Sequence, residues 1–181
     1  GYLSIQGGFK LKKYYDSIST LTRADIGSNN GKKIQENQKI FFNNNLIDNS
    51  KRKIIIKNKI KDHTIRVVKG PQFDYFAKNS INEFFTSPFI VSNNSDRMGM
   101  RLEGPKIENI VNTNITSEGL IKGVIQVPPD GNPIIMLSDH GTIGGYPKIG
   151  VVISADYDKL VQLTPGSKIK FKDVNLSEAE N

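Results

Sequence analysis

Two arginines and two acidic residues cluster in the string SDRMGMRLEGP, residues 95–105. In a β-strand alternate side chains share a face, so Arg97, Arg101 and Glu103 would point the same way, with Gly99 leaving room between them. Guanidinium groups placed like this could hold a carboxylate or a phosphate through paired hydrogen bonds. The alternative is a structural Arg–Glu pair that joins two strands, which is the more frequent arrangement in an arbitrary protein.

Polar side chains and glycines also gather in the string SDHGTIGGYPKIG, residues 138–150. Dense glycines permit positive φ and expose backbone N–H groups, so this segment could cradle an oxyanion or a phosphate. Its spacing matches neither a P-loop nor a dinucleotide-binding fingerprint, so it predicts no specific nucleotide site. A hydrogen bond within the loop explains His140 as well as a role as a base does. The candidate contact residues are Asp139, His140, Thr142, Gly144, Gly145, Tyr146 and Lys148.

Gln126 lies in the middle of an apolar run, residues 124–127. A buried amide side chain is costly unless its donors and its acceptor are paired. We therefore expect Gln126 to serve either packing or ligand recognition. The residues that follow, 128–131, need no further function, because the sequence Pro-Pro-Asp-Gly is explained by a tight turn.

The chain has 181 residues, no cysteine, two histidines and a net charge of +7. The lack of cysteine excludes disulfides and thiolate sites, and two histidines argue against a histidine-based metal site. Much of the positive charge lies in residues 51–69, which contain no aromatic residue. That segment could be a nucleic-acid stripe, but without aromatic rings on which bases stack, an edge strand with solvated lysines is favoured. No apolar stretch reaches the roughly 20 residues that span a membrane, so we expect a soluble protein without nucleic-acid or membrane partners.

Short apolar runs separated by Gly, Pro and Asn predict a mainly β protein, either a barrel or a sandwich. One helix is expected over residues 71–85 with a break near Asn79, and another from an N-cap at Asp156 to Leu163. The spacing of Ser177 and Glu180 predicts one more helix start. The predicted strands cover residues 2–5, 39–42, 53–60, 64–68, 89–92, 123–127, 133–137, 148–153 and 168–174.

Several longer strings together resemble one family. The chain contains, in this order, GYLSIQGGF, RVVKGPQFDYF, SDRMGMRLEGP, the element Ser117-Glu118-Gly119, GVIQVPPDGNPII, GGYPKIGVVISAD and QLTPGSKIKF. These strings resemble the biotin-dependent carboxyltransferase family, whose members include the C subunit of bacterial ATP-dependent 5-oxoprolinase, a second allophanate-hydrolase-type subunit and a part of urea carboxylase. The resemblance implies cyclophilin-like β-barrels with a few short helices. It divides the chain into residues 1–60, the end of a first barrel-like lobe whose start is missing, and residues 61–181, a barrel domain truncated at its end.

The same resemblance implies a cytoplasmic enzyme subunit that opens the lactam of 5-oxoproline to give glutamate. ATP would be used by the assembled complex, and the partners would be a B-type subunit, an A-type subunit and a small amide substrate. An inert amide needs preorganised cations and N–H donors, so the site roles follow from residue type. Arg97, Arg101 and Lys148 would contact anions, Asp139, Glu103 and Glu118 would act as acid, base or orienting groups, and Gln126, Tyr146, Thr142, Gly144 and Gly145 would bind substrate.

Two alternatives stay open. The first is transfer of a carboxyl group from carboxybiotin to urea or a related amide, with biotin as cofactor and the same cations holding the carboxylate. The second is a regulatory module without catalysis that antagonises a kinase inhibitor through tight binding to its partner. In each case we expect the piece of 181 residues to be inactive alone.

Overall fold

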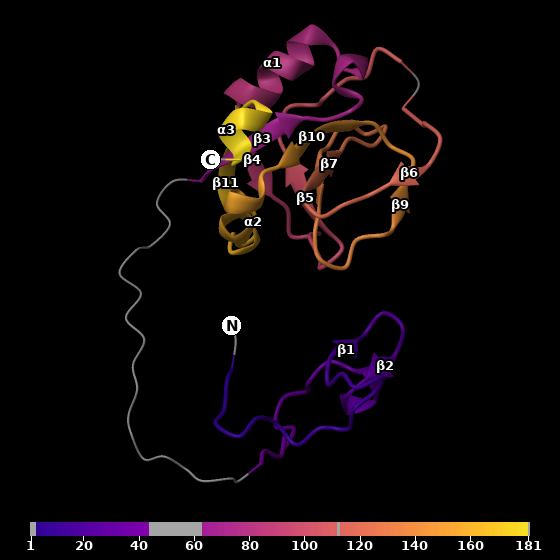
Figure 1. Ribbon diagram of the computed structural model, residues 1–181, viewed down its shortest axis with the longest axis vertical. Coiled ribbons are helices and arrows are strands. Elements are labelled where there is room, and N and C mark those ends of the chain that lie inside the picture. The colour runs from indigo at the N-terminus through magenta and orange to yellow at the C-terminus, as the bar shows by residue number, and fades with distance from the viewer. Residues whose placement is uncertain (1–2, 44–62, 112, 181) are drawn as a thin grey trace. The chain divides into compact units, whose positions relative to one another are not determined.

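The computed structural model describes residues 3–43, 63–111 and 113–180. The chain divides into two compact units, Gly1–Ile56 and Lys57–Asn181, and each is described by itself (Figure 1). The assignment of residues 1–60 and 61–181 to two barrel lobes stays a prediction. The basic residues 51–61 and the strand predicted at residues 53–60 lie outside the described residues.

The described part of the first unit contains little regular structure. Strands β1 (Thr20–Leu21) and β2 (Ile26–Gly27) pair antiparallel, and the short 3-10 helix η1 (Asn29–Gly31) follows. The strand predicted at residues 39–42 is wrong, because Phe42 makes only an isolated bridge with Phe9. Residues 3–5 of the first predicted strand also lie outside any strand. An apolar run becomes a strand only where a neighbour pairs with its backbone along several residues.

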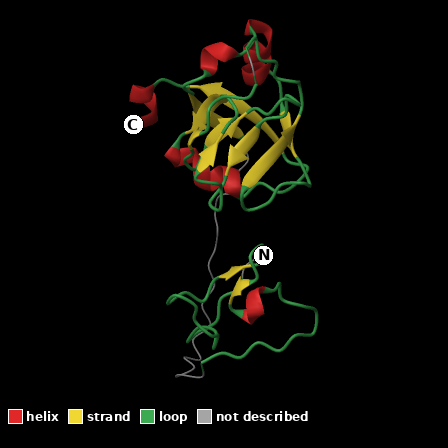
Figure 2. Ribbon diagram, turned by 90° about the vertical axis from the view of Figure 1, so that its right-hand side faces the viewer, coloured by secondary structure: helices red, strands yellow, loops and turns green. Residues whose placement is uncertain are grey.

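In the second unit, seven of the described strands form a closed barrel in the order β10-β3-β11-β4-β5-β8-β7. Neighbours run antiparallel except β3 and β11, which are parallel. Figure 2 shows the yellow strands of the barrel with red helices at its periphery. The prediction of a mainly β fold with a barrel and a few short helices is confirmed. The strands are β3 (Thr64–Lys69), β4 (Phe89–Val91), β5 (Gly99–Glu103), β7 (Val124–Gln126), β8 (Ile134–Met136), β10 (Lys148–Val152) and β11 (Lys168–Asp173).

The barrel closes around an apolar interior because side chains alternate along each strand. In β11, Ile169 and Phe171 are buried while Lys168, Lys170 and Lys172 are exposed. Helix α1 (Lys78–Thr86) packs on this strand, and its Phe84 ring stacks on Phe171 with centroids 4.4 Å apart. The abundant lysines of this strand therefore lie on the solvent side, as the period-two pattern requires.

The helix predicted over residues 71–85 is split into two elements. A 3-10 helix, η2 (Phe73–Tyr75), precedes α1, and the break lies at Phe76 and Ala77 rather than near Asn79. The backbone is extended at the break because the N–H of Ala77 donates to the carbonyl of Glu108 at 3.0 Å. A contact with a distant segment thus ends the short helix, and local propensity carries no signal of it.

Asp156 is not the N-cap that the sequence suggested. Helix α2 (Ser154–Val161) begins after Ile153, and Asp156 lies in its first turn with its carboxylate buried. That carboxylate accepts hydrogen bonds from the backbone N–H of Arg66 at 2.8 Å and from its guanidinium at 2.8 and 3.1 Å. The side chain fastens the helix to β3 instead of capping it.

The last helix, α3 (Leu176–Glu180), has its N-cap at Asn175, two residues before the predicted one at Ser177. Asn175 and Glu178 exchange side-chain to backbone hydrogen bonds at 2.9 and 3.0 Å. This reciprocal pair is a capping box, so the predicted box at Ser177 and Glu180 is wrong by two residues. Among the described residues, no helix has the length and the apolar composition needed to cross a membrane.

Two very short strands, β6 (Glu118–Gly119) and β9 (Ile143–Gly144), pair antiparallel outside the barrel. Their pairing continues on both sides, because Leu120 donates to the carbonyl of Thr142 and Ile115 to that of Gly145, each at 2.9 Å. We call residues 115–120 and 142–145 the strap. Sequence reasoning did not predict it, because neither strand is long enough to show a periodic pattern.

The bond between Asp156 and Arg66 predicts a pH-dependent stability. Burial raises the pKa of the Asp156 carboxyl, but the hydrogen bonds from Arg66 outweigh this and the pKa is lowered. The bond's contribution to the free energy of unfolding is therefore complete above the ordinary aspartate pKa of about 3.9. It is lost as the pH falls through the lower pKa of the folded state. Asp156→Asn should reduce the free energy of unfolding by about 1–3 kcal/mol at pH 7.

Urea unfolding at pH 7 and at low pH checks this expectation. The difference between Asp156→Asn and the parent chain should shrink as the pH falls from about 3.9, where the unfolded carboxyl begins to take up its proton, through the lower folded pKa, below which the carboxyl group is neutral in both states. Asp158→Asn, an exposed position on the same helix, is the matched control and should change little. An equal loss at both pH values would mean that the ionised carboxylate is not what stabilises the helix.

Candidate functional site

The strap lies against the outer wall of the barrel and buries a second, small apolar cluster. Leu120, Val124 and Met136 form this cluster, with Ile134 and Val151 packed against it. The interior of the barrel is filled by a different set, including Ile125, Ile135 and Ile149. Because residues alternate along β7 and β8, the neighbours of Ile125 and Ile135 face outward, under or beside the strap.

Gly144 lets the strap approach the barrel wall. A Cβ atom at this position would lie 2.6 Å from Nε2 of Gln126 and 2.8 Å from Cδ1 of Leu120. No side chain fits there without displacing a buried group. Gly144 therefore serves close packing against Gln126.

Gln126 and Lys148 are direct partners on adjacent strands β7 and β10, and both are buried. Nε2 of Gln126 donates to the carbonyl of Tyr146 at 3.2 Å. The expectation of a buried amide at Gln126 is confirmed. A register shift between Lys148 and Gly150 interrupts the ladder at this point. Such irregularities re-aim side chains in a sheet, and here the lysine emerges beside the strap.

The ammonium group of Lys148 is the chemical centre of the site. The Lys148 side chain is only 4% exposed, and its Nζ lies 2.7 Å from Oε2 of Glu118, whose side chain is 46% exposed. A buried cation is costly unless it is paired, so the strap carboxylate accounts for the burial of Lys148. The pair joins β10 to β6 and reaches solvent at Glu118.

A further residue completes the arrangement. The buried side chain of Gln72 donates from Nε2 to both oxygens of Glu118, at 3.0 and 3.3 Å. Its Oε1 accepts the backbone N–H of Lys148 at 3.2 Å. We call Gln72, Glu118, Gln126 and Lys148 the Lys148 cluster. Sequence reasoning missed Gln72 because it took residues 71–85 as one helix; a polar side chain in the string GPQ directly after a strand was the available signal.

The pKa of Glu118 is lowered, first by the hydrogen bond from Lys148 and then by that from Gln72. The carboxyl group is therefore ionised at neutral pH and can accept hydrogen bonds or orient a cation. In this state it cannot donate a proton. The cluster thus offers a buried cation, an anion at the surface and amide groups that can hold a polar ligand.

Arg97 is not on the strand that was predicted for it. It precedes β5, and its guanidinium binds the Asp139 carboxylate through Nε at 2.6 Å and a terminal nitrogen at 3.0 Å. These bonds lower the pKa of Asp139. The Arg97 side chain is 82% exposed. The expectation that Arg97, Arg101 and Glu103 share a strand face is therefore wrong for Arg97, which pairs with Asp139 instead.

Arg101 and Glu103 do share the exposed face of β5, and Oε1 of Glu103 accepts a hydrogen bond from Ser92 at 2.5 Å. Arg101 also lies in one row with the Lys148 cluster. It pairs with Ile134, which pairs with Gln126, which pairs with Lys148. At about 4.8 Å between strands, the row places Arg101 about 14 Å from Lys148 along the outer wall.

The remaining predicted residues make more limited contacts. Thr142 and Gly145 use their carbonyls within the strap, and Tyr146 contributes its carbonyl to Gln126. His140 bonds through Nδ1 to the carbonyl of Gly141 at 2.6 Å, as the loop interpretation expected. In the part of the chain that the structure describes, no three His, Asp or Glu side chains lie close enough together to hold a metal ion.

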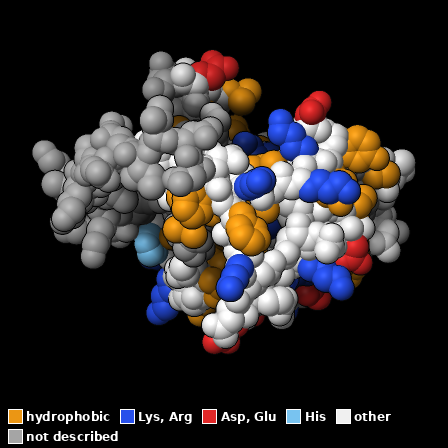
Figure 3. Space-filling model, turned by 90° about the horizontal axis from the view of Figure 1, so that it is seen from below, with side chains coloured by type: hydrophobic (Ala, Val, Ile, Leu, Met, Phe, Trp, Pro, Cys, Tyr) orange, Lys and Arg blue, Asp and Glu red, His pale blue; other side chains and the backbone are white. Residues whose placement is uncertain are grey.

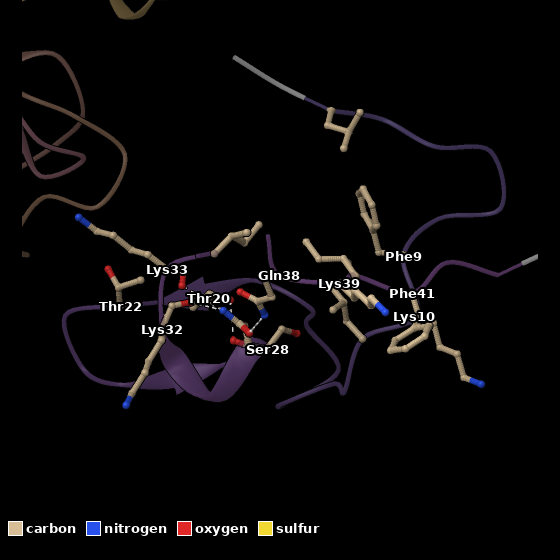
Figure 4. Close-up of a pocket in the computed structure, with 15 residues that line it drawn as sticks. Phe9, Lys10, Thr20, Thr22, Ser28, Lys32, Lys33, Gln38, Lys39 and Phe41 are labelled. Carbon is tan, nitrogen blue, oxygen red and sulfur yellow. Dashed lines mark hydrogen bonds between the residues drawn. The ribbon is translucent and has the colours of Figure 1, made fainter. Parts of the chain in front are cut away.

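The first unit contains a cavity of about 610 Å³, lined by residues of that unit alone. Its wall includes Phe9, Phe41 and four lysines, and the ammonium groups of Lys10, Lys32 and Lys33 point in different directions (Figure 4). Basic side chains are likewise dispersed among apolar surface on the face drawn in Figure 3. Cations that diverge do not preorganise an anion site, so we place the candidate site at the Lys148 cluster.

Comparisons with known proteins relate nearly the whole chain to one family. Residues 1–173 match the family described as carboxyltransferase domain, subdomain A and B. The 5-oxoprolinase C subunit of Escherichia coli (strain K12) is 33% identical over 178 residues, which are 98% of this chain and 57% of that protein. The corresponding protein of Haemophilus influenzae, which has the same name, is 38% identical over 179 residues, or 99% of this chain and 57% of that protein.

A solved structure is similar over nearly the whole chain as well. The crystal structure of Kluyveromyces lactis urea carboxylase aligns with a TM-score of 0.78 at 27% identity, over 98% of this chain and 18% of that one. The chain spans 57% of the length of the two 5-oxoprolinase proteins that it matches. Nearly all of its own length is thus similar to parts of longer proteins.

The contact at Gly144 can be tested with a matched pair of variants. Gly144→Ala should lower the free energy of unfolding by about 1–3 kcal/mol, because the new methyl group meets Gln126 and Leu120. Gly119→Ala, on the partner strand of the strap, is the control, since nothing lies within 4 Å of a Cβ there. Thermal unfolding of both variants measures the difference. Equal melting temperatures would mean that the strap is not packed on the barrel as described.

Proposed function

Because the chain belongs to the carboxyltransferase domain family, subdomains A and B, we propose that it forms part of the C subunit of a 5-oxoprolinase. In this proposal the complex opens the lactam of 5-oxoproline and releases glutamate, with ATP and two further subunits. The observation that carries it is the similarity, over 98% and 99% of the chain, to two proteins named as 5-oxoprolinase C subunits. A cytoplasmic location belongs to the same proposal.

The Lys148 cluster has the chemistry that such a substrate needs. A lactam is inert until its oxygen is activated or the developing negative charge is stabilised, and buried cations do this best where water is excluded. Lys148 supplies the cation, while the Glu118 carboxylate and the Gln126 amide can pair with the N–H and C=O groups of an amide. The substrate would approach at Glu118, the exposed member of the cluster.

Arg97, Arg101, Asp139 and Glu103 keep a secondary place in the proposal. Arg101 lies in the row that leads to Lys148, on the exposed part of the outer wall, where it could contact the carboxylate of an amino-acid-like substrate. Arg97 and Asp139 are bonded to each other and would act by holding the ends of β5 and β8 together. Their backbones also bond, from the N–H of Asp139 to the carbonyl of Arg97 at 3.0 Å.

The Lys148 cluster does not fit a triphosphate. Gly144 is packed against Gln126, and one ammonium beside the Glu118 carboxylate cannot balance the charge of three phosphates. The use of ATP is therefore assigned to the assembled complex and not to the Lys148 cluster. The residues of this chain bind and orient the amide.

Carboxyl transfer to urea or a related amide is the second candidate. The similarity to urea carboxylase of Kluyveromyces lactis favours it, and Lys148 could hold a carboxylate in the same place. Biotin would then be carried by another domain, and a biotin carboxylase and its carrier would accompany the chain. Two small separate partner subunits would favour the lactam-opening function instead.

Replacement of Lys148 tests the site within the complex. The full-length protein is co-expressed with its partner subunits, and glutamate formation from 5-oxoproline and ATP is measured, with urea and carboxybiotin in parallel. Lys148→Met should reduce turnover by at least about 100-fold, the usual cost of removing one preorganised charge donor. Lys170→Met, an exposed lysine of β11, is the matched control.

Glu118→Gln supports the same test, because its amide oxygen still accepts a hydrogen bond from the Lys148 ammonium while the negative charge is removed. It should also lower turnover, since a neutral amide holds the Lys148 ammonium less strongly. Full activity in both variants, with circular dichroism unchanged, would remove the Lys148 cluster from the active site. Turnover of urea instead of 5-oxoproline would favour the carboxyl-transfer function.

A further inference from the structure

Gln72 is held against Lys148 by a turn that requires glycine. The N–H of Gly70 donates to the carbonyl of Ile149 at 3.0 Å, and a Cβ at Gly70 would lie 2.3 Å from the carbonyl oxygen of Lys148. The backbone at Gly70 therefore lies closer to β10 than a residue with a side chain would allow. Gln72 follows two residues later, and its side chain is directed to the Lys148 backbone and the Glu118 carboxylate.

We propose that Gln72 is a positioning residue that holds the Glu118 carboxylate on the Lys148 ammonium and so keeps the strap aligned over the site. The proposal rests on the proposed function in taking this cluster as the substrate site. Neither the family match nor the similarity to relatives assigns a role to Gln72.

The two ends of the Gln72 carboxamide have different partners. Its NH₂ group donates to Glu118, and its oxygen accepts from Lys148, so a single side chain bonds both members of the ion pair. Glutamate has no donor for Glu118, and methionine lacks both groups. Without these bonds, the Glu118 carboxylate is held by the Lys148 ammonium and not by Gln72. Because Glu118 is half-exposed, its carboxylate can then turn toward water.

Gln126, the other amide of the cluster, has a different kind of partner. Its side chain donates to the backbone carbonyl of Tyr146. Gln72 instead bonds an ionised side chain at the mouth of the site. Among the described residues, Lys148 from β10 is the ionisable group bonded to Glu118, and Gln72 is the neutral one. The titration of Glu118 therefore reports on its bonds to Lys148 and to Gln72.

The titration of Glu118 tests the proposal without any assay of activity. Glutamate side chains of the protein are labelled with ¹³C, and the Glu118 carboxyl signal is followed by NMR from about pH 2 to pH 7, a range that brackets the ordinary glutamate pKa. In Gln72→Met the pKa of Glu118 should rise toward that ordinary value of about 4.3, because two hydrogen bonds to the carboxylate are lost. Gln126→Met, which removes a buried amide that bonds a backbone carbonyl, should leave this pKa unchanged.

An unchanged pKa of Glu118 in Gln72→Met would overturn the proposal, even if the melting temperature falls. Gln72→Glu provides a second variant if the methionine does not fold. It keeps the shape and the acceptor for the Lys148 N–H but places a like charge beside Glu118, so the pKa of Glu118 should rise further. No rise in this variant would likewise contradict the role of Gln72.

Activity in the assembled complex adds a second readout. Gln72→Met should lower glutamate formation by up to about 100-fold, the cost of a misplaced catalytic group. Full activity together with a raised pKa of Glu118 would show that the alignment of Glu118 is not needed, which also overturns the proposal. A parent complex without turnover would contradict the proposed function, whereas the NMR titration would still decide whether Gln72 positions Glu118.

Discussion

The burial of one ammonium group is the constraint on which the site depends. Lys148 lies on the outer wall of the barrel with its side chain 4% exposed, so its charge needs a partner that the barrel strands do not provide. The strap brings that partner, Glu118, and Gln72 fixes it from a third segment. Three parts of the chain, near residues 72, 118 and 148, are thereby joined by one electrostatic requirement.

Glycines make this assembly possible. Gly70 lets the turn before Gln72 touch β10, and Gly144 lets the strap rest on Gln126. Each position would place a Cβ atom within 2.6 Å of a neighbour. These two glycines thus let the segments that carry Gln72 and Glu118 approach Lys148 closely enough to bond.

The barrel could be predicted from the sequence because its strands bury one face and alternate. The segments predicted at residues 64–68, 123–127 and 168–174 became β3, β7 and β11 with small changes at their ends. The N-caps predicted at Asp156 and Ser177 are wrong for a physical reason. The Asp156 carboxylate bonds to Arg66 on β3, and the cap of the last helix is formed by Asn175. Likewise, Gln126 could be singled out as a buried amide, but Gln72 could not be linked to Glu118 across 46 residues without the fold.

The ion pair between the buried Lys148 and the half-exposed Glu118 serves function rather than stability. Lys148→Met combined with Glu118→Leu replaces both charges by apolar groups of similar size, and such replacements of buried pairs are often neutral or stabilising. The decisive measurement is the turnover of the assembled complex beside the thermal unfolding of this double variant. We predict a melting temperature at or above that of the parent with turnover lost by about 100-fold or more. A stable double variant with full turnover would contradict the functional role of the pair.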